Sequence, residues 1–437
     1  MTPKVILLAA ALLSLTVAVA AEEELPRKTL AECLEIALQR QPTLAAAGAS
    51  VQAANQRVWQ AASGYLPQIF GNYDANRRQT SATAQTGASG LGTVSQTFNF
   101  YSTGVAFSQV LFDFGKTLAL IRAAQDNERS AQANYVTQRE VVVLNVKQSY
   151  FNVIAARRLL EVAEETLRDT QKQLEQAQGR HDVGLAPRFD VTTAEVQVAN
   201  AELNLVTARN NLDVARVTLR NAMGLTGPVD FDVVDALQQR PINTNEQQAL
   251  DTAYASRPEL QSLEAQKASQ EQQIASLQRD YLPSVGGTGS YNWTGTNYPL
   301  GSNWNVGASV TVSVFNGGLT TAQIGEAKAN LANLEYTEDS TRQNIALEVR
   351  QALLTVRRAW ESIRVSEKGL QSARESLALA EGRYNTGVGN IIELTDAQAS
   401  LTTAEANLVQ AVVGYQVAIA ALERAIGRPI GPRGEIG

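Results

Sequence analysis

The sequence predicts a mostly helical, internally duplicated chain with a small transmembrane β part. Three observations carry this prediction: one residue pattern is written twice at nearly constant offset, apolar residues recur with heptad spacing, and short segments alternate between apolar and polar residues. The composition agrees, because 44% of the residues are hydrophobic but only 6% are aromatic. Ala, Leu and Val supply most of this apolar content, which is typical of long helices.

The first twenty residues have the features of an export signal. Lys4 is followed by an apolar run over Val5–Val19, and Ala18-Val19-Ala20 is a small-x-small cleavage site. We therefore expect cleavage after Ala20 and export of the chain; an uncleaved N-terminal anchor is the alternative. Beyond this segment no run of 18 apolar residues occurs, so the chain would have to enter a membrane as strands.

Two copies of one pattern cover almost the whole chain. Tyr65–Pro67 recurs 216 positions later as Tyr281–Pro283, and Gly184 recurs 203 positions later as Gly387. We assign the difference of 13 positions to an exposed loop at Thr80–Gly92, which is rich in Ser, Thr, Gly, Gln and Ala.

The duplication predicts how the chain is organised. Each copy is expected to contain a helix, a strand hairpin and a long helical hairpin. The expected bounds are 1–20 for the signal peptide, 21–230 for the first copy with strands at about 66–112 and the helical hairpin at 116–224, 231–250 for a linker, 251–427 for the second copy with strands at about 282–315 and the helical hairpin at 319–427, and 428–437 for a tail.

The long helices are expected to pack on other helices. From Val191 to Ala222, and again from Leu394 to Ala425, large apolar residues and alanines recur at alternating spacings of three and four. A heptad pattern of this length indicates a coiled coil, and its alanines let the helix backbones approach closely. An ordinary coiled-coil protein would show the same pattern. The predicted strands therefore decide between such a protein and one that enters a membrane.

Alternating segments in the middle of each copy predict membrane strands. Val306–Val314 places Val or Ala at every even position and Gly, Ser or Thr at every odd position, and Val105–Leu111 is a weaker version with Gln109 as an exception. One apolar and one polar face are typical of a membrane β-barrel; a sheet on a soluble core is the alternative. Four strands cannot close a barrel, and lipid does not tolerate open edges, so copies must combine. Two copies give eight strands and three give twelve, and a passage requires the larger ring.

Few residues are available for catalysis or for metal binding. The chain has one cysteine, Cys33, and one histidine, His181, which nearly excludes zinc sites and catalytic machinery that needs a second histidine. Cys33 follows Thr29 and Glu32, a capping-box pair, and is expected to pack in the first helix. We predict no catalytic residue, no cofactor and no metal site. The net charge of −6 argues against a nucleic-acid partner.

Signal peptide, duplication, strand hairpins and two tip sequences together resemble the TolC family of outer-membrane efflux ducts. The tip sequences are GRHDVGLAPRFDVTTAEVQVANAEL from Gly179 and GRYNTGVGNIIELTDAQASLTTAEANL from Gly382. The resemblance implies a homotrimer whose 12-stranded β-barrel, with four strands per chain, lies in the lipid of a Gram-negative outer membrane. A periplasmic α-helical coiled-coil barrel would continue it. The resemblance also implies that the chain is the passive exit duct of a tripartite efflux or type I secretion system. Its partners would be a periplasmic adaptor (membrane fusion) protein and an inner-membrane pump.

The resemblance further implies roles for residues at the two helix reversals. Adaptor hairpins of the family dock beside the tips, which here implicates Val183, Gly184, Leu185, Thr386, Gly387 and Val388. Both glycines also fit a simpler role as turn residues with positive φ. Tyr384 and Asp190 match a gate tyrosine and its aspartate partner. The gate arginine of the family is replaced by Gly389, and whether Arg188 substitutes for it is left open.

Glu393 and Asp396 match an acidic pair that forms an aperture ring in the family. Their i, i+3 spacing puts both on one helical face, and three copies would place six carboxylates around a pore that favours cations. An acidic first turn that complements the helix dipole after Asn390 is the alternative.

Two other classes of protein stay open on the sequence alone. A soluble periplasmic coiled-coil adaptor or scaffold would share the helices but would not need strands with a lipid-facing side. An exported enzyme would need a pocket of convergent polar groups, of which the sequence shows no sign. Neither the substrate, the class of pump nor the resting state of the gate can be predicted.

Overall fold

The computed structural model describes residues 26–80, 96–228, 231–235, 237, 240–242 and 245–429. The expected signal peptide, almost all of the expected loop after Thr80 and most of the expected tail lie outside these residues.

Within the described residues the chain forms eight α-helices and six strands. The helices are α1 (Leu30–Arg40), α2 (Pro42–Ala62), α3 (Lys116–Asp182), α4 (Arg188–Ala222), α5 (Glu246–Ser256), α6 (Pro258–Gln278), α7 (Leu319–Asn385) and α8 (Ile391–Ile426). The strands are β1 (Arg27–Lys28), β2 (Gln68–Thr80), β3 (Gln96–Phe112), β4 (Asp232–Val233), β5 (Ser284–Gly295) and β6 (Gly301–Thr311).

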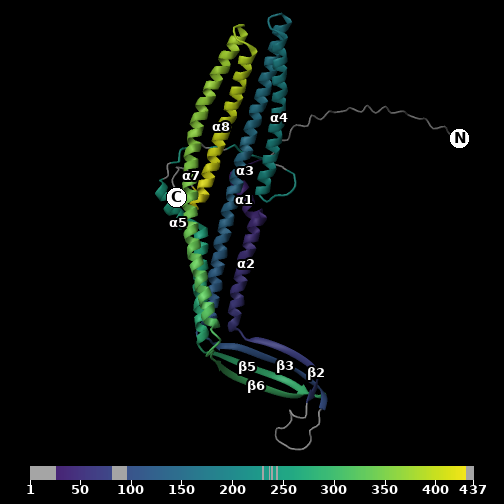
Figure 1. The fold of residues 1–437 in the computed structure, drawn as a ribbon. Helices are drawn as coiled ribbons and strands as arrows, with labels where there is room; N and C mark the ends of the chain where they lie inside the picture. The colour runs from purple at the N-terminus through teal and green to yellow at the C-terminus, as the bar shows by residue number, and fades with distance from the viewer. Residues whose placement is uncertain are drawn as a thin grey trace, which may run out of the picture.

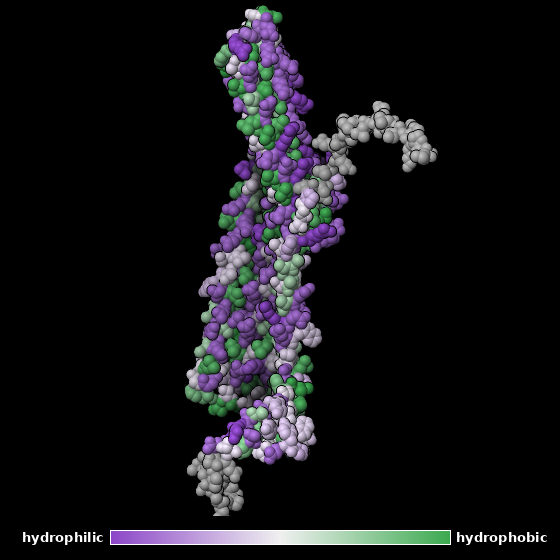
Figure 2. Space-filling model, turned by 90° about the vertical axis from the view of Figure 1, so that its right-hand side faces the viewer, coloured by the Kyte–Doolittle hydropathy of each residue, from purple (hydrophilic) through white to green (hydrophobic). Residues whose placement is uncertain are grey.

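The molecule is a long rod of helices with a curved sheet at one end (Figure 1). The helices α3 and α7 have 67 residues each, or about 100 Å of length, and run along most of the rod. Towards the free end they pair with α4 and α8, and towards the sheet they pair with α2 and α6. Hydrophilic and hydrophobic residues are interspersed along the helical part (Figure 2).

The two copies have the same helices at the same offsets. The bounds of α1 and α2 recur in α5 and α6 after 216 positions, and those of α3 recur in α7 after 203 positions. One difference from the sequence analysis is that two helices, not one, precede each strand hairpin. Pro42 and Pro258 begin the second helix of each pair, because proline has no amide hydrogen and keeps the preceding residue, Gln41 or Arg257, in an extended conformation.

The residues at these breaks hold the ends of the returning helices. The Gln41 side chain donates to the carbonyls of Asn221 and Ala222 near the end of α4, at 3.4 and 3.1 Å. Arg257 Nη1 donates to the equivalent carbonyls of α8, at 3.1 and 3.3 Å. The same cap is therefore built twice with different side chains.

The predicted heptad positions form the contact within each helical hairpin. All of the positions predicted from Val191 to Ala222 and from Leu394 to Ala425 are buried or half-buried. Within the described residues, α8 is the one helix that is long and apolar enough, by length and composition, to cross a membrane. Its apolar face packs against α7.

The first helix begins as its sequence predicts. The Thr29 hydroxyl accepts from the Glu32 amide at 3.3 Å, and the Glu32 carboxylate accepts from the Thr29 amide at 2.6 Å. Cys33 is fully buried in the core where α1 meets α3, so it acts as a packing residue.

Strands β2, β3, β5 and β6 form one antiparallel sheet in that order. Its register aligns apolar positions of all four strands in one row and polar positions in another. The rows are Ile69, Phe107, Gly289 and Val306 on one face and Asn72, Gly104, Asn292 and Asn303 on the other. No other described segment covers the apolar face, and Ile69 and Val306 are each 70% exposed. Strands β2 and β6 have free edges within the described chain.

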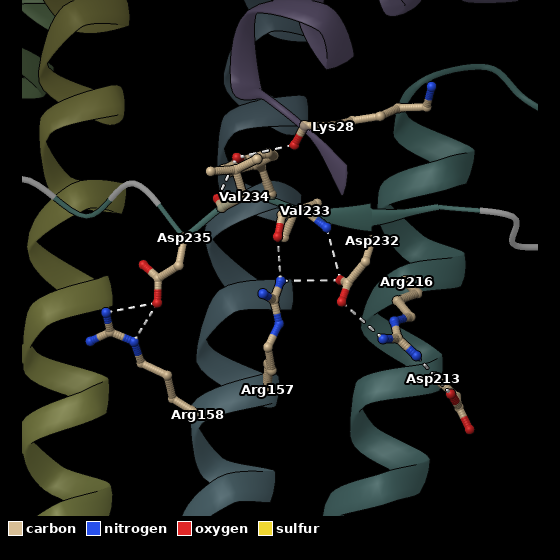
Figure 3. A network of polar contacts seen from close by, with 10 residues as sticks. Lys28, Arg157, Arg158, Asp213, Arg216, Asp232, Val233, Val234 and Asp235 are labelled. Atoms are coloured by element: carbon tan, nitrogen blue, oxygen red, sulfur yellow. Dashed lines mark hydrogen bonds and ion pairs between the residues drawn. The ribbon is translucent and has the colours of Figure 1, made fainter. Parts of the chain in front are cut away.

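A network of arginines fixes the segment between the copies to the first helical hairpin. Arg157 of α3 and Arg216 of α4 converge on the Asp232 carboxylate, at 3.1 and 3.3 Å (Figure 3). Arg157 also donates to the Val233 carbonyl at 2.7 Å. The short parallel pair of β1 and β4 is thereby held against α3.

Removing the shared carboxylate should loosen this attachment. In Asp232→Ala two half-buried guanidinium groups lose their partner, which costs roughly 1–3 kcal/mol. Hydrogen exchange of the Val234 amide, which donates to the Lys28 carbonyl at 3.0 Å, should accelerate about tenfold or more. The control is Asp213→Ala, because Asp213 lies 3.8 Å from Arg216 but its side chain is 74% exposed. Equal acceleration in both variants would contradict the assignment.

Candidate functional site

The free end of the rod consists of two tight helix reversals. The first joins α3 to α4 and the second joins α7 to α8 (Figure 1). Gly184 and Gly387 have φ of 77° and 76°, a conformation that residues with a Cβ rarely adopt. The expected role of both glycines as turn residues is confirmed.

Apolar side chains are exposed at both reversals. Val183, Leu185 and Val388 are 68%, 72% and 72% exposed, and Thr386 between them is exposed as well. The six residues implicated in docking thus form two small, partly apolar tips at the end of the molecule.

Tyr384 links the two helical hairpins. It lies in the last turn of α7 and is only 3% exposed. Its hydroxyl donates to Asp190 Oδ2, in the first turn of α4, at 3.3 Å. The structure therefore brings together the two residues that the resemblance paired.

Burial raises the pKa of the Tyr384 hydroxyl, and the nearby Asp190 carboxylate raises that pKa further. Tyr384 therefore keeps its proton and acts as the donor. The hydrogen bond contributes fully below the ordinary tyrosine pKa of about 10 and is lost as the pH rises through the raised value.

The arginine that contacts this pair is Arg180, not Arg188. The Arg188 side chain is exposed, and among the described residues it has no hydrogen bond or ion pair with Tyr384 or Asp190. Arg180 Nη1 donates to the carbonyls of Tyr384 and Asn385 at 2.8 and 3.2 Å, and its guanidinium lies 4.8 Å from the centre of the Tyr384 ring. The repeat held a signal for it, because Gly179-Arg180 recurs as Gly382-Arg383.

The backbone at Gly389 explains why no arginine stands there. A Cβ at this position would lie 2.9 Å from Arg383 Cβ and 3.1 Å from the Tyr384 nitrogen. Any side chain would force the reversal to move. This tip is therefore built for glycine, and an arginine latch at 389 is incompatible with it.

Glu393 and Asp396 lie exposed on one face of α8 and line a hollow between α7 and α8. Glu393 Oε1 accepts from Arg383 Nε at 2.9 Å. The Glu393 amide is capped by the Asn390 side chain at 2.8 Å. Glu393 is thus both an N-terminal helix residue and part of an acidic surface, so the geometry is compatible with both sequence interpretations.

His181, the one histidine of the chain, lies at the first reversal. The His181 ring lies 3.0 Å from the Ala186 carbonyl within the first reversal, so it belongs to the turn. In the part of the chain that the structure describes, no group of three or more His, Cys, Asp or Glu side chains is arranged to hold a metal ion.

Comparison with known proteins assigns the chain to a family. Residues 33–225 and 249–428 match the family described as outer membrane efflux protein. The chain is 27% identical over 408 residues to the outer membrane protein TolC of Escherichia coli (strain K12), covering 88% of this chain and 79% of that protein. It is 26% identical to the outer membrane efflux protein BepC of Brucella suis, covering 92% and 86%.

A solved structure shows the same fold. The Campylobacter jejuni CmeC outer membrane channel superposes with a TM-score of 0.79 at 19% identity, covering 91% of this chain and 85% of that one. By their names, TolC is an outer membrane protein, BepC an outer membrane efflux protein and CmeC an outer membrane channel. By the family match over most of its length, the chain belongs to the outer membrane efflux protein family.

Proposed function

We propose that three copies of this chain form an outer-membrane exit duct that passively conducts substrates out of the cell. The observation that carries the proposal is the uncovered apolar face of a four-stranded sheet in a chain of this family. The sheet would lie in the outer membrane, and the helices would extend into the periplasm.

Three sheets would give a ring of twelve strands, in which β6 of one chain pairs with β2 of the next. This pairing satisfies the free edges of both strands in lipid. The polar row of Asn72, Asn292 and Asn303 would face the lumen. A ring of this size leaves a passage, which a ring of eight does not.

The tips would dock a periplasmic adaptor and, through it, an inner-membrane pump of a tripartite efflux or type I secretion system. The exposed Val183, Leu185 and Val388 support such a contact. The duct itself would supply a route, a gate and docking surfaces, and the pump would supply the energy. The comparisons do not support the alternative of a soluble periplasmic adaptor, because the similar proteins are outer-membrane channels.

Membrane fractionation tests the assembly. The mature chain should remain with the outer membrane after alkaline extraction and should have the mass of three chains in detergent. Val310→Arg, on the apolar face of β6, should reduce the amount of assembled protein, because a charge on the lipid face costs about 2–4 kcal/mol at mid-membrane. Ser309→Arg, on the opposite face, is the control. A water-soluble monomer, or equal effects of the two variants, would contradict the proposal.

The pair Tyr384 and Asp190 is proposed as a latch of the closed gate. Tyr384→Phe combined with Asp190→Ala should raise the conductance of single pores in planar bilayers, because the hydrogen bond between the helical hairpins is lost. Tyr336→Phe is the matched control, since this tyrosine also lies on α7 but is 75% exposed. Unchanged conductance of the double variant would remove the latch.

Glu393 and Asp396 are proposed as a cation-selective ring near the periplasmic end. Glu393→Gln with Asp396→Asn should reduce cation selectivity, because six carboxylates would leave the aperture. The reversal potential in a salt gradient measures this. Glu375→Gln, an exposed carboxylate on α7, should leave the reversal potential unchanged. An unaltered reversal potential in the ring variant would mean that Glu393 serves only its helix end.

A further inference from the structure

The two helical hairpins of the chain have separate apolar cores near their tips. The first hairpin, α4 with the adjoining half of α3, has a small core of Ala177, Val191 and Ala194. The second, α8 with the adjoining half of α7, has its own core, which includes Leu377, Tyr384 and Leu394. Neither of these two clusters contains a residue of the other hairpin. Each hairpin is therefore packed as a unit.

The contact between the hairpins is polar over the same length. Thr166 of α3 and Thr402 of α8 join their hydroxyl groups at 3.0 Å. Further towards the tips, the Gln173 side chain donates to Gln398 Oε1 at 3.3 Å, with both residues buried. A hollow between α3, α4 and α8 is lined here by Thr, Gln, Asn and Ala side chains alone.

The spacing of these residues makes them one continuous strip, which we call the polar seam. Thr166, Thr170, Gln173 and Arg180 follow one another at spacings of four, three and seven and so share one face of α3. The strip is polar except at Ala177, a member of the first hairpin's core, which lies on this face between Gln173 and Arg180. Separating a contact of this kind exposes groups that water can hydrogen-bond, whereas separating an apolar contact exposes surface that water does not solvate favourably. The seam can open without exposing a core.

Arg180 holds the tip end of the polar seam. Its two hydrogen bonds to the carbonyls of Tyr384 and Asn385 cross from α3 to α7, and its guanidinium packs on the Tyr384 ring. Its Nε is buried and has no hydrogen-bond partner among the described residues, so this contact is incompletely satisfied and water would complete it on release. The repeat-equivalent Arg383 instead pairs with Glu393 inside its own hairpin.

The polar seam ends where an apolar core joins the two hairpins. Val413 of α8 belongs to the same cluster as Val146, Tyr150 and Phe151 of α3. Just before this level lies Glu405 of α8. Burial raises the pKa of its carboxyl and the charge of Glu165 raises it further, whereas Arg374 of α7, which lies 3.6 Å from this carboxyl, lowers it. Glu405 is thus paired within its own hairpin and faces a like charge across the seam.

We propose that Arg180 is the clasp of a releasable seam, along which the two hairpins of each chain part while staying joined at the core around Val413. This inference rests on the proposed gate at the tips, and it assigns to Arg180 a positioning role that the resemblance does not supply. Opening then consists of losing the Arg180 contacts and the hydrogen bond from Tyr384 to Asp190 and of hydrating the polar seam, with both hairpin cores intact.

The first test compares two arginines of α3 in the full-length protein in planar bilayers. Arg180→Gln should raise the open fraction of single pores about tenfold or more, because two charge-assisted hydrogen bonds between the hairpins are lost. Arg168→Gln is the control, since Arg168 is exposed and its one hydrogen bond within the described residues goes to the Glu164 carbonyl of its own helix. Equal open fractions in Arg180→Gln and the wild type overturn the inference.

The second test locks the polar seam reversibly. In a Cys33→Ala background that also carries Arg180→Gln, Thr166→Cys with Thr402→Cys places two thiols where the hydroxyls lie 3.0 Å apart. The oxidised protein should stay closed, and reduction of the same sample should restore the high open fraction. Pores that open equally well in both states overturn the inference, because the hairpins would then not part at this level.

A third comparison separates this inference from the proposed function. Replacing the polar pair by Gln173→Leu with Gln398→Leu should suppress the opening caused by Arg180→Gln, whereas Gln171→Leu with Gln410→Leu, at exposed positions of the same helices, should not. A purified protein that forms no pores refutes the proposed function. Pores that respond to the Tyr384 and Asp190 variants but not to Arg180→Gln refute the clasp alone.

Discussion

The constraint on which the rest of the structure depends is the pair of free edges of the four-stranded sheet. Strands β2 and β6 each leave one row of backbone groups without partners within the sheet, and each unpaired group would cost several kcal/mol in hydrocarbon. Only further strands can satisfy both edges. Because β2 follows α2 and β6 leads into α7, any ring that closes the sheets also arranges the helices below them in a ring.

The duplication places two helical hairpins of the same kind in each chain, and the two copies differ in the residues at which they contact each other. Helix bounds repeat at fixed offsets, so both hairpins have the same length and reach. Yet Arg180 crosses to the other hairpin, whereas its equivalent Arg383 stays with Glu393. Likewise Gln41 and Arg257 cap equivalent helix ends with different chemistry. The repeat therefore sets the frame, and individual polar residues make the copies unequal.

Periodic features of the sequence predicted most of the fold, whereas contacts between distant segments were not predictable. The heptad pattern predicted the buried helix faces, the alternating pattern predicted the two faces of β6, and two glycines predicted the helix reversals. All three features depend on local backbone geometry. The break at Pro42 was missed although proline signals it. For the gate, Arg188 was suggested because it is near in sequence, but the arginine that contacts Tyr384 is Arg180. Arg180 and Tyr384 are 204 positions apart, so their contact depends on how the two hairpins pack and not on local sequence.

The division of polar and apolar contacts decides how such a molecule can move. Apolar packing inside each hairpin makes it a stiff unit, since bending it would expose the heptad residues. A polar contact between the hairpins can exchange its partners for water at small net cost. A partner that binds the tips can shift the gate only by the difference between its affinities for the closed and open forms. Because the hairpins are joined near the tips by few strong contacts, the affinity difference needed to open the gate is one that an ordinary protein contact can supply. A continuous apolar core between the hairpins would require a larger difference.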